Sequence, residues 1–304
     1  MSRKKRYYNG LEISKKTNVV LNIFMFLVAA ISLYPLLLMF SVSITDETAI
    51  SMNGYRLFPS KISFYAYEYI FHSLDAVVRG YGITMFTTVV GALLSVAIMA
   101  MYAYPLSRSS FKYKNGFSFF VYFTMLFGGG LVPWYIMYVK MLHLKNTIWV
   151  MIIPYLVTAV HILIIRTFYR TSVPEEIIEA AKIDGAGEFY TFCRIVLPLS
   201  KPVMGTIMLF STLKYWNDWY LPMIFITDEK MYTLQYLLYK LEKNIEFLVS
   251  SSNVSGDASM SLALVPSESS RMALAILVIG PIIFAYPFFQ KYLKDGMTIG
   301  AVKG

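Results

Sequence analysis

The chain has 304 residues, of which 57% are hydrophobic and only 15% are charged, and its mean hydropathy is +0.56. This balance excludes an ordinary water-soluble domain and indicates an all-α integral membrane protein. The net charge of +9 would suggest nucleic acid in a soluble chain, but in a membrane protein the positions of Lys and Arg matter more, so no nucleic-acid partner is expected. The single cysteine, Cys193, excludes an internal disulfide and a multi-cysteine metal site.

Six apolar stretches are each long enough to cross a hydrocarbon layer of about 30 Å. They are residues 19–44, 80–107, 116–139, 146–169, 202–227 and 272–292. Three glycines at 128–130 and Pro133 interrupt the third stretch, and Pro154 is expected to kink the fourth. The first stretch exceeds the roughly 7–15 apolar residues of a signal peptide and leads to no small-residue cleavage site, so it is predicted to remain as a helix.

The polar segments predict the orientation. Lys and Arg are more frequent in segment 1–18, in the 108–115 loop, in segment 172–202 and in the tail 293–304 than in the other three loops. The positive-inside rule therefore places both termini in the cytoplasm. Segment 45–79 is expected to be a structured extracytoplasmic loop, and 228–270 a long polar loop with a mobile Ser-rich piece at 250–261.

Segment 172–202 is predicted to be a helical hairpin between two spans. Ser172 and Glu175 match a capping box, and Pro174 fits a first helical turn. The dipeptide Asp184-Gly185 is typical of a turn, and a second short helix should end near Pro198. The hairpin should face the cytoplasm, because it follows the fourth span.

The hairpin also carries a family motif. Glu179-Ala180-Ala181, Gly185 four residues later, and then Ile195, Leu197 and Pro198 resemble the EAA loop of permease subunits of binding-protein-dependent ABC importers. In that family the loop couples the membrane subunit to its ATPase. The resemblance implies coupling roles for Glu179, Ala180, Ala181, Asp184 and Gly185. A chance Glu-Ala-Ala on an amphipathic hairpin is the alternative, in which Glu179 is only a solvated charge near Lys182.

The resemblance extends over about residues 80–304 and is greatest to the maltose-type, carbohydrate-uptake branch. It rests on Arg166-Thr167-Phe168, Asp184-Gly185-Ala186, Tyr215-Trp216-Asn217 and the tail Gly300-Ala301-Val302-Lys303-Gly304. Gly129-Gly130-Leu131-Val132-Pro133 and Asn146-Thr147 are more similar to a subgroup for oligosaccharides released from polysaccharides. The loop after the fifth span departs from the maltose-type relatives in length, which puts its contact with a binding protein in doubt.

The family implies a type I ABC importer permease fold, with residues 80–292 as the transmembrane domain of five helices behind the additional first helix. It also implies partners: a second homologous permease subunit, two cytoplasmic ATPase subunits, an extracytoplasmic solute-binding protein, an oligosaccharide and membrane lipid. The tail Gly300–Gly304 would reach between the ATPase subunits. The cell membrane of a bacterium is the implied location.

Polar residues in the fifth span form a candidate substrate path. Lys214, Asn217 and Asp218 have the i, i+3, i+4 spacing of one helix face, with Tyr215 and Trp216 beside them. Such a set of hydrogen-bonding groups and aromatic rings suits a sugar. Two alternatives remain open: Lys214 pairs with Asp218 to hold the bundle, or the aromatics mark the membrane interface. His161 with Thr158 could line a cavity or make a buried interhelical hydrogen bond.

No chemistry of its own is predicted for the chain. A Walker A loop needs a Gly-Lys pair, which the sequence lacks, so ATP and Mg would be used by the partner ATPase and no cofactor is expected on this chain. The three histidines have no metal-binding spacing, and Gly-x-Ser-x-Gly is absent. An ion-coupled secondary transporter is the alternative function, but it would have no use for the hairpin, and a membrane enzyme ranks third.

Overall fold

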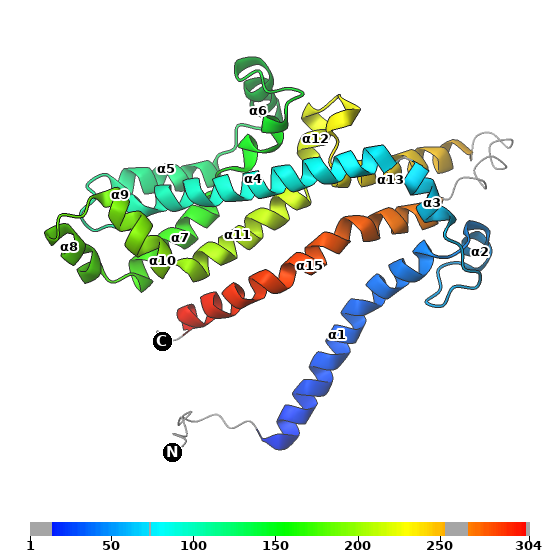
Figure 1. Cartoon of the computed structure of the whole chain (residues 1–304), viewed down its shortest axis with the longest axis horizontal. Helices are drawn as coiled ribbons and strands as arrows, with labels where there is room; N and C mark the ends of the chain where they lie inside the picture. The colour runs from blue at the N-terminus through cyan, green and yellow to red at the C-terminus, as the bar shows by residue number, and fades with distance from the viewer. Residues whose placement is uncertain (1–13, 73, 253–266, 302–304) are drawn as a thin grey trace. The chain divides into compact units, whose positions relative to one another are not determined.

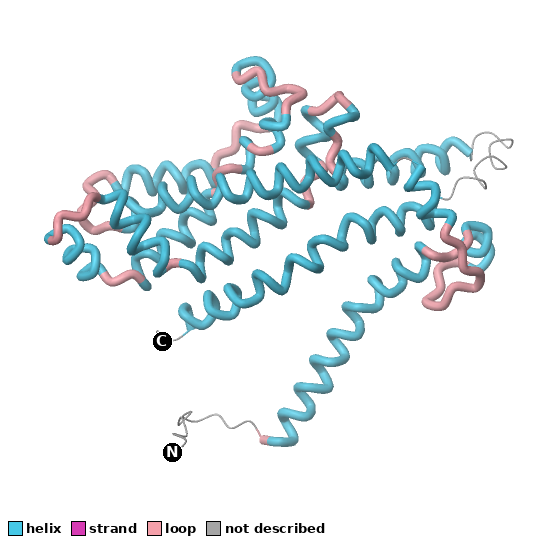
Figure 2. Tube along the Cα trace, viewed as in Figure 1, coloured by secondary structure: helices cyan, strands magenta, loops and turns pink. Residues whose placement is uncertain are grey.

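The computed structural model describes residues 14–72, 74–252 and 267–301. These segments are helices joined by loops, with one isolated antiparallel bridge between Thr45 and Ile62 (Figure 2). The chain divides into two compact units, residues 1–69 with 256–276 and residues 70–255 with 277–304. Each unit is described by itself.

The first unit begins with α1 (Lys15–Ser43), a helix of 29 residues (Figure 1). Its large apolar side chains from Val19 to Leu37 are exposed, as expected for a helix whose solvent is lipid. The helix contains Pro35 and ends at Ser43, whose hydroxyl lies 3.0 Å from the hydroxyl of Tyr67. The predicted first span is therefore a helix of spanning length.

The loop after α1 is ordered by short polar contacts. Helix α2 (Glu47–Asn53) begins at Asp46, whose carboxylate accepts a hydrogen bond from the Thr48 amide at 3.2 Å and pairs with Lys61 at 3.0 Å. Helix α3 (Tyr65–His72) follows. The Glu47 carboxylate in turn accepts bonds from the Glu268 and Ser269 amides at 3.0 and 3.1 Å, at the start of α15 (Ser267–Ala301). The prediction of a structured loop is confirmed.

The second unit is organised on α4 (Leu74–Ser107), a helix of 34 residues drawn in cyan in Figure 1. Helices α7 (Ala159–Ser172) and α11 (Lys201–Trp216) pack against it. The core between them is formed by small and β-branched side chains, including Ala100, Ala103, Ile162, Ile165, Val203 and Ile207. Small residues on α4 let the neighbouring backbones approach closely, which is how apolar helices associate in lipid.

Two of the predicted spans are bent pairs of helices, and a further bent pair joins Glu188–Leu199 of the predicted hairpin to α11, at 83°. The third is α5 (Lys114–Leu126) followed, after the Gly triplet, by α6 (Leu131–Ile136) and a π-helical turn to Met141, at 113°. The fourth is a pair of 3-10 turns (Ile148–Met151 and Ile153–Tyr155) followed by α7, at 50°. By length and composition, the described part contains three helices able to cross a membrane, or up to six spans if each bent pair counts as one.

The fifth predicted span is not one helix. Helix α11 ends at Trp216, and α12 (Tyr220–Phe225) follows after a turn. Pro222 explains the break, because it has no amide to donate to the carbonyl of Asp218 four residues earlier. That carbonyl accepts the Thr233 hydroxyl at 3.1 Å instead.

Two further expectations are corrected. Residues 234–252 form helix α13 (Leu234–Ser252), where a polar loop was predicted, because Leu234, Leu237, Leu238 and Leu241 recur with helical spacing. Helix α15 continues to Ala301, so the first part of the predicted tail is helical. Most of the Ser-rich piece, from residue 253 on, lies outside the described residues.

Candidate functional site

The hairpin is built from α8 (Glu175–Ile183), a tight turn and α9 (Glu188–Thr191). In the turn, Gly185 adopts φ +80°, and the amides of Asp184 and Ala186 donate to the carbonyls of Ala180 and Ala181 at 3.0 and 2.9 Å. A left-handed residue closing the last helical turn is the usual end of a helix and favours glycine. The predicted turn is therefore present, and the positive φ angle at residue 185 explains why a glycine stands there.

The predicted capping box is absent. Ser172 is the last residue of α7, and α8 begins after Pro174, which makes no side-chain cap. Pro174 forces the preceding Val173 into extended backbone (φ −107°, ψ 108°), and this ends α7. The Glu175 carboxylate accepts the Ser109 hydroxyl instead, and this hydrogen bond is the main cause that lowers the pKa of Glu175.

One face of the hairpin holds it against the rest of the unit. Ile178 and Ala181 are buried, and Ile178 belongs to the same core cluster as Tyr104. Lys182 pairs with Glu188 at 2.6 Å, and Glu188 accepts the Tyr104 hydroxyl at 2.9 Å. The hairpin is thereby attached to α4 by both packing and hydrogen bonds, so it can move as one rigid piece with that helix.

The other face is exposed and apolar. Ile183 is 86% exposed, Phe189 72%, and Tyr190 and Ile177 also expose much of their side chains. Of the motif residues, Glu179, Ala180, Asp184 and Gly185 share this exposure, while Ala181 is buried. Large apolar side chains gathered on an exposed segment mark a surface for a protein partner.

The candidate substrate residues do not share one face. Tyr215, Trp216 and Asp218 are buried, whereas Lys214 and Asn217 are exposed. The Tyr215 hydroxyl donates to the Ile152 carbonyl at 2.8 Å, and the Trp216 indole donates to the Val278 carbonyl at 3.0 Å. These two aromatic side chains therefore join α11 to its neighbours.

The Asp218 carboxylate is held in place by three hydrogen bonds. One carboxylate oxygen accepts the Tyr155 hydroxyl at 3.1 Å and the amides of Tyr220 and Leu221 at 3.2 Å, at the start of α12. The Lys214 ammonium and the Asp218 carboxylate are more than 4.0 Å apart, too far for an ion pair. The ammonium lies 3.4 Å from the Thr158 hydroxyl and 4.2 Å from the centre of the Tyr155 ring. The alternative of a direct Lys214–Asp218 bridge is wrong, because the helix ends between them.

Asn217 closes α11 and keeps an exposed amide. Its Nδ2 donates to the Leu213 carbonyl at 2.9 Å, and its Oδ1 accepts the Gln235 amide at 3.1 Å. Tyr155, Thr158 and Gln235 were not predicted as part of this set; the only sequence signal was their polarity within or beside apolar segments. His161 stacks on Phe210, and its Nδ1 makes no hydrogen bond within the described chain.

Asn146, quoted above from the subgroup motif, has a structural role. It adopts φ +58°, and its side-chain oxygen accepts the Thr227 and Asp228 amides at 2.6 and 3.1 Å. Asparagine tolerates this conformation better than most residues.

Of the predicted tail residues, Gly300 and Ala301 end α15, and Val302, Lys303 and Gly304 lie outside the described residues. The described part contains no group of three His, Cys, Asp or Glu that could hold a metal.

Residues 98–299 match a protein family described as binding-protein-dependent transport system inner membrane component. The chain belongs to this family. As a permease subunit of an ABC importer, it is a multi-pass membrane protein rather than an ion-coupled secondary transporter, and its family role is transport and not catalysis.

Relatives and a solved structure agree with this assignment. Protein LplC of Bacillus subtilis (strain 168) is 35% identical over 91% of each chain. The polygalacturonan/rhamnogalacturonan transport system permease protein YtcP of the same organism is 32% identical, over 92% of this chain and 96% of its own. A solved bacterial ABC transporter involved in import of the acidic polysaccharide alginate contains a chain with TM-score 0.77 and 26% identity, over 94% of this permease and 100% of that chain.

Proposed function

We propose that this permease forms, with a second homologous permease subunit, the translocation path for an oligosaccharide derived from a polysaccharide. One similar protein is named for transport of polygalacturonan and rhamnogalacturonan, whose galacturonate units carry carboxylates, and another belongs to a transporter involved in import of the acidic polysaccharide alginate. Lys214 and Asn217 are exposed residues at the end of α11, and an ammonium and an amide suit the carboxylate and hydroxyl groups of such a sugar. The substrate class is therefore an acidic oligosaccharide.

The observation that carries the proposal is the hairpin's exposed apolar face on a rigidly attached support. Two cytoplasmic ATPase subunits, which use ATP and Mg, would receive Ile183, Phe189 and the motif residues Glu179, Ala180 and Asp184. Closure of the ATPase pair would then move α4 with the hairpin, as a rigid-body change between two states. A solute-binding protein would deliver the sugar on the opposite side of the membrane.

The orientation and domain boundaries belong to the same proposal. Both termini lie in the cytoplasm, residues 19–44 form the first span, residues 80–292 hold five further spans, and 172–202 is the coupling hairpin. The third and fourth of these spans are the two bent pairs outside the hairpin. Residues 1–18 and 293–304 are the cytoplasmic ends. The tail Gly300–Gly304 would contact the ATPase subunits, and its deletion should lower transport-coupled ATP hydrolysis more than membrane insertion.

The test is an uptake assay in cells that carry the whole importer. Glu179→Ala should abolish or strongly reduce both co-purification of the ATPase and uptake of oligogalacturonides, with the permease still inserted in the membrane. Arg194→Ala, another exposed charge of the segment that lies outside the motif, is the matched control. Normal ATPase binding and uptake in Glu179→Ala would contradict the coupling role, and uptake of neutral oligosaccharides only would contradict the substrate class.

A further inference from the structure

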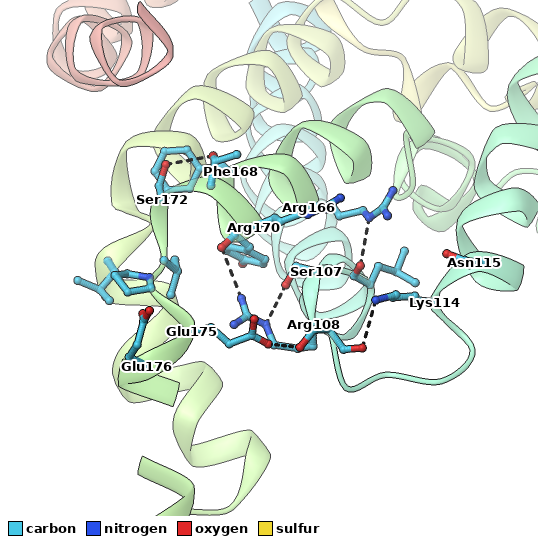
Figure 3. A pocket seen from close by; sticks show the side chains of 17 residues that line it. Ser107, Arg108, Lys114, Asn115, Arg166, Phe168, Arg170, Ser172, Glu175 and Glu176 are labelled. Atoms are coloured by element: carbon cyan, nitrogen blue, oxygen red, sulfur yellow. Dashed lines mark hydrogen bonds between the residues drawn. The ribbon is translucent and has the colours of Figure 1, made fainter. Parts of the chain in front are cut away.

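A cavity of about 920 Å³ lies at the root of the hairpin, where α4, α5 and α7 meet. Figure 3 shows its polar side chains directed toward one space from the 107–115 segment and from the end of α7. Four cations and two carboxylates line it: Arg108, Lys114, Arg166 and Arg170, with Glu175 and Glu176. The cavity is therefore cationic overall.

Three of the four cations are held in place by neutral groups. Arg108, only 6% exposed, donates from Nε to the Ser107 hydroxyl at 3.0 Å and from Nη2 to the Tyr169 carbonyl at 3.5 Å. Arg166 Nε donates to the Leu106 carbonyl at 3.1 Å, and Lys114 Nζ donates to the Ser109 carbonyl at 3.1 Å (Figure 3). These bonds fix each side chain while leaving other donors of Arg166 and Lys114 for a further acceptor.

These four side chains make no ion pair within the described chain. Among residues 14–72, 74–252 and 267–301, no carboxylate lies within 4.0 Å of the charged nitrogens of these four side chains. Glu175, on the cavity wall, accepts the Ser109 hydroxyl, and Arg108 and Lys114 act on its carboxylate from beyond ion-pair distance. A buried arginine without an anion is costly, so the arrangement favours an anionic ligand that accepts several hydrogen bonds. Tyr169, fully buried on the same wall, also has an unpartnered hydroxyl within the described chain.

A second cavity lies beside the first turn of α5 and has a different lining. It measures about 580 Å³ and is lined by Tyr102, Tyr113, Gly116, Phe117, Phe120 and Lys112. Residues 113, 116, 117 and 120 share one helix face, whereas Lys114 and Asn115 of the same turn line the cationic cavity. A Cβ atom added at Gly116 would meet nothing within 4 Å, so this apolar space is open at that point.

Both cavities lie where apolar helices end. α4 and α7 end at Ser107 and Ser172, beside the cationic cavity, which is the level expected for lipid headgroups. We propose that the two cavities together bind one anionic phospholipid, with the phosphate among Arg108, Lys114 and Arg166 and an acyl chain against Tyr113 and Phe117. Cationic pockets at the ends of membrane helices recognise such headgroups. A free phosphate would use the first cavity alone.

The bound lipid would connect the hairpin to the membrane. The cavity wall includes Pro174, Glu175 and Glu176 at the start of α8, so a headgroup there contacts the segment that leads into the coupling motif. Occupancy should stabilise the position of the hairpin, and transport-coupled ATP hydrolysis should then depend on anionic lipid.

The experiment uses the complete purified importer, delipidated in detergent and titrated with phosphatidylglycerol, phosphatidylcholine or inorganic phosphate, with bound molecules counted by native mass spectrometry. Lys114→Gln with Arg166→Gln should weaken phosphatidylglycerol binding about 30-fold, since each cation near a membrane surface contributes about 1 kcal/mol. Arg194→Gln, an exposed cation outside both cavities, is the matched control and should bind as the wild type does.

A second variant tests the apolar half independently of charge. Gly116→Leu should lower phosphatidylglycerol binding but leave phosphate binding unchanged, while Gly82→Leu, at another open glycine, should change neither. Phosphatidylglycerol binding that both cavity variants retain would overturn the proposal. Inorganic phosphate that binds as tightly as the lipid would also overturn it, and so would a crosslink from the Ser109→Cys variant that places an ATPase segment inside the cavity. If the double variant fails to assemble, Lys114→Gln alone and Gly116→Leu still decide.

Discussion

A Cβ atom at Gly91 would lie 2.6 Å from the ring of Tyr215, closer than real Cβ contacts come. The ring cannot move away freely, because its hydroxyl donates to the Ile152 carbonyl at 2.8 Å and lies 3.2 Å from the Ser95 hydroxyl. At Gly91, α4 thus lies directly against a fixed aromatic side chain of α11. The position of the Tyr215 ring therefore leaves no room for a side chain at residue 91.

Gly91→Ala is therefore expected to destabilise the permease by about 1–3 kcal/mol, because the added methyl group overpacks the interface. The measurement is thermal unfolding of the purified subunit in detergent. Gly82→Ala on the same helix is the control: nothing lies within 4 Å of its added Cβ, and Ala favours a helix over Gly by about 1 kcal/mol. The two substitutions should shift the unfolding temperature in opposite directions, and equal shifts would contradict the interpretation.

The hairpin turn makes a second prediction. Gly185→Val should displace the turn, because a β-branched residue disfavours φ +80° by at least about 1–2 kcal/mol. ATPase co-purification and uptake should fall, while membrane insertion stays normal. Gly187→Val is the matched control, since Gly187 has φ −68° and open space around it. Gly185→Asn should retain more activity than Gly185→Val, because Asn tolerates the left-handed region.

The hairpin could be predicted from the sequence because its determinants are local. Asp184-Gly185 favours a turn, although the same dipeptide at 295–296 lies inside α15, and the motif spacing predicts two short helices around it. The prediction of a capping box was wrong because two local rules compete in this segment. Pro174 keeps Val173 in extended backbone, so Ser172 is the last residue of α7 and does not cap the next helix. Pro174 therefore decides where α7 ends and α8 begins.

The polar set on the fifth span could not be predicted in the same way. The spacing of Lys214, Asn217 and Asp218 fits a helix face only if the helix continues, and Pro222 four residues after Asp218 removes the bond that continuation needs. The partners that then decide burial, Tyr155 and Ile152, lie about 60 residues away in sequence. Contacts of that separation leave no periodic signal in either segment.

A third prediction concerns pH and the loop after α1. The Thr48 hydroxyl and then Lys61 lower the pKa of Asp46 from 3.8 to about 2. Because the folded pKa is the lower one, the stabilisation is complete above pH about 4 and is lost as the pH falls toward 2. Pepsin cleavage between residues 47 and 63 should therefore accelerate over this window in the wild type. Asp46→Asn keeps a capping oxygen without the titration, so its cleavage rate should lack this additional acceleration.

The last prediction separates the exposed from the buried members of the polar set. Lys214→Gln and Asn217→Ala should each reduce uptake of acidic oligosaccharides about tenfold and leave ATPase assembly and thermal stability nearly unchanged, because both side chains are exposed. Asp218→Ala should instead destabilise the subunit by about 1–3 kcal/mol, since the Tyr155 hydroxyl and two amides lose their acceptor.

The deciding measurement is uptake of charged and neutral oligosaccharides beside thermal unfolding for each of the three variants. Lys214→Gln should affect the charged substrate more than the neutral one, because its ammonium, held near Thr158 and the Tyr155 ring, has no ion-pair partner within 4.0 Å in the described chain. Asn217→Ala should affect both sugars. Unaltered uptake by Lys214→Gln and Asn217→Ala would place the substrate path on other residues and leave this end of α11 with a structural role alone.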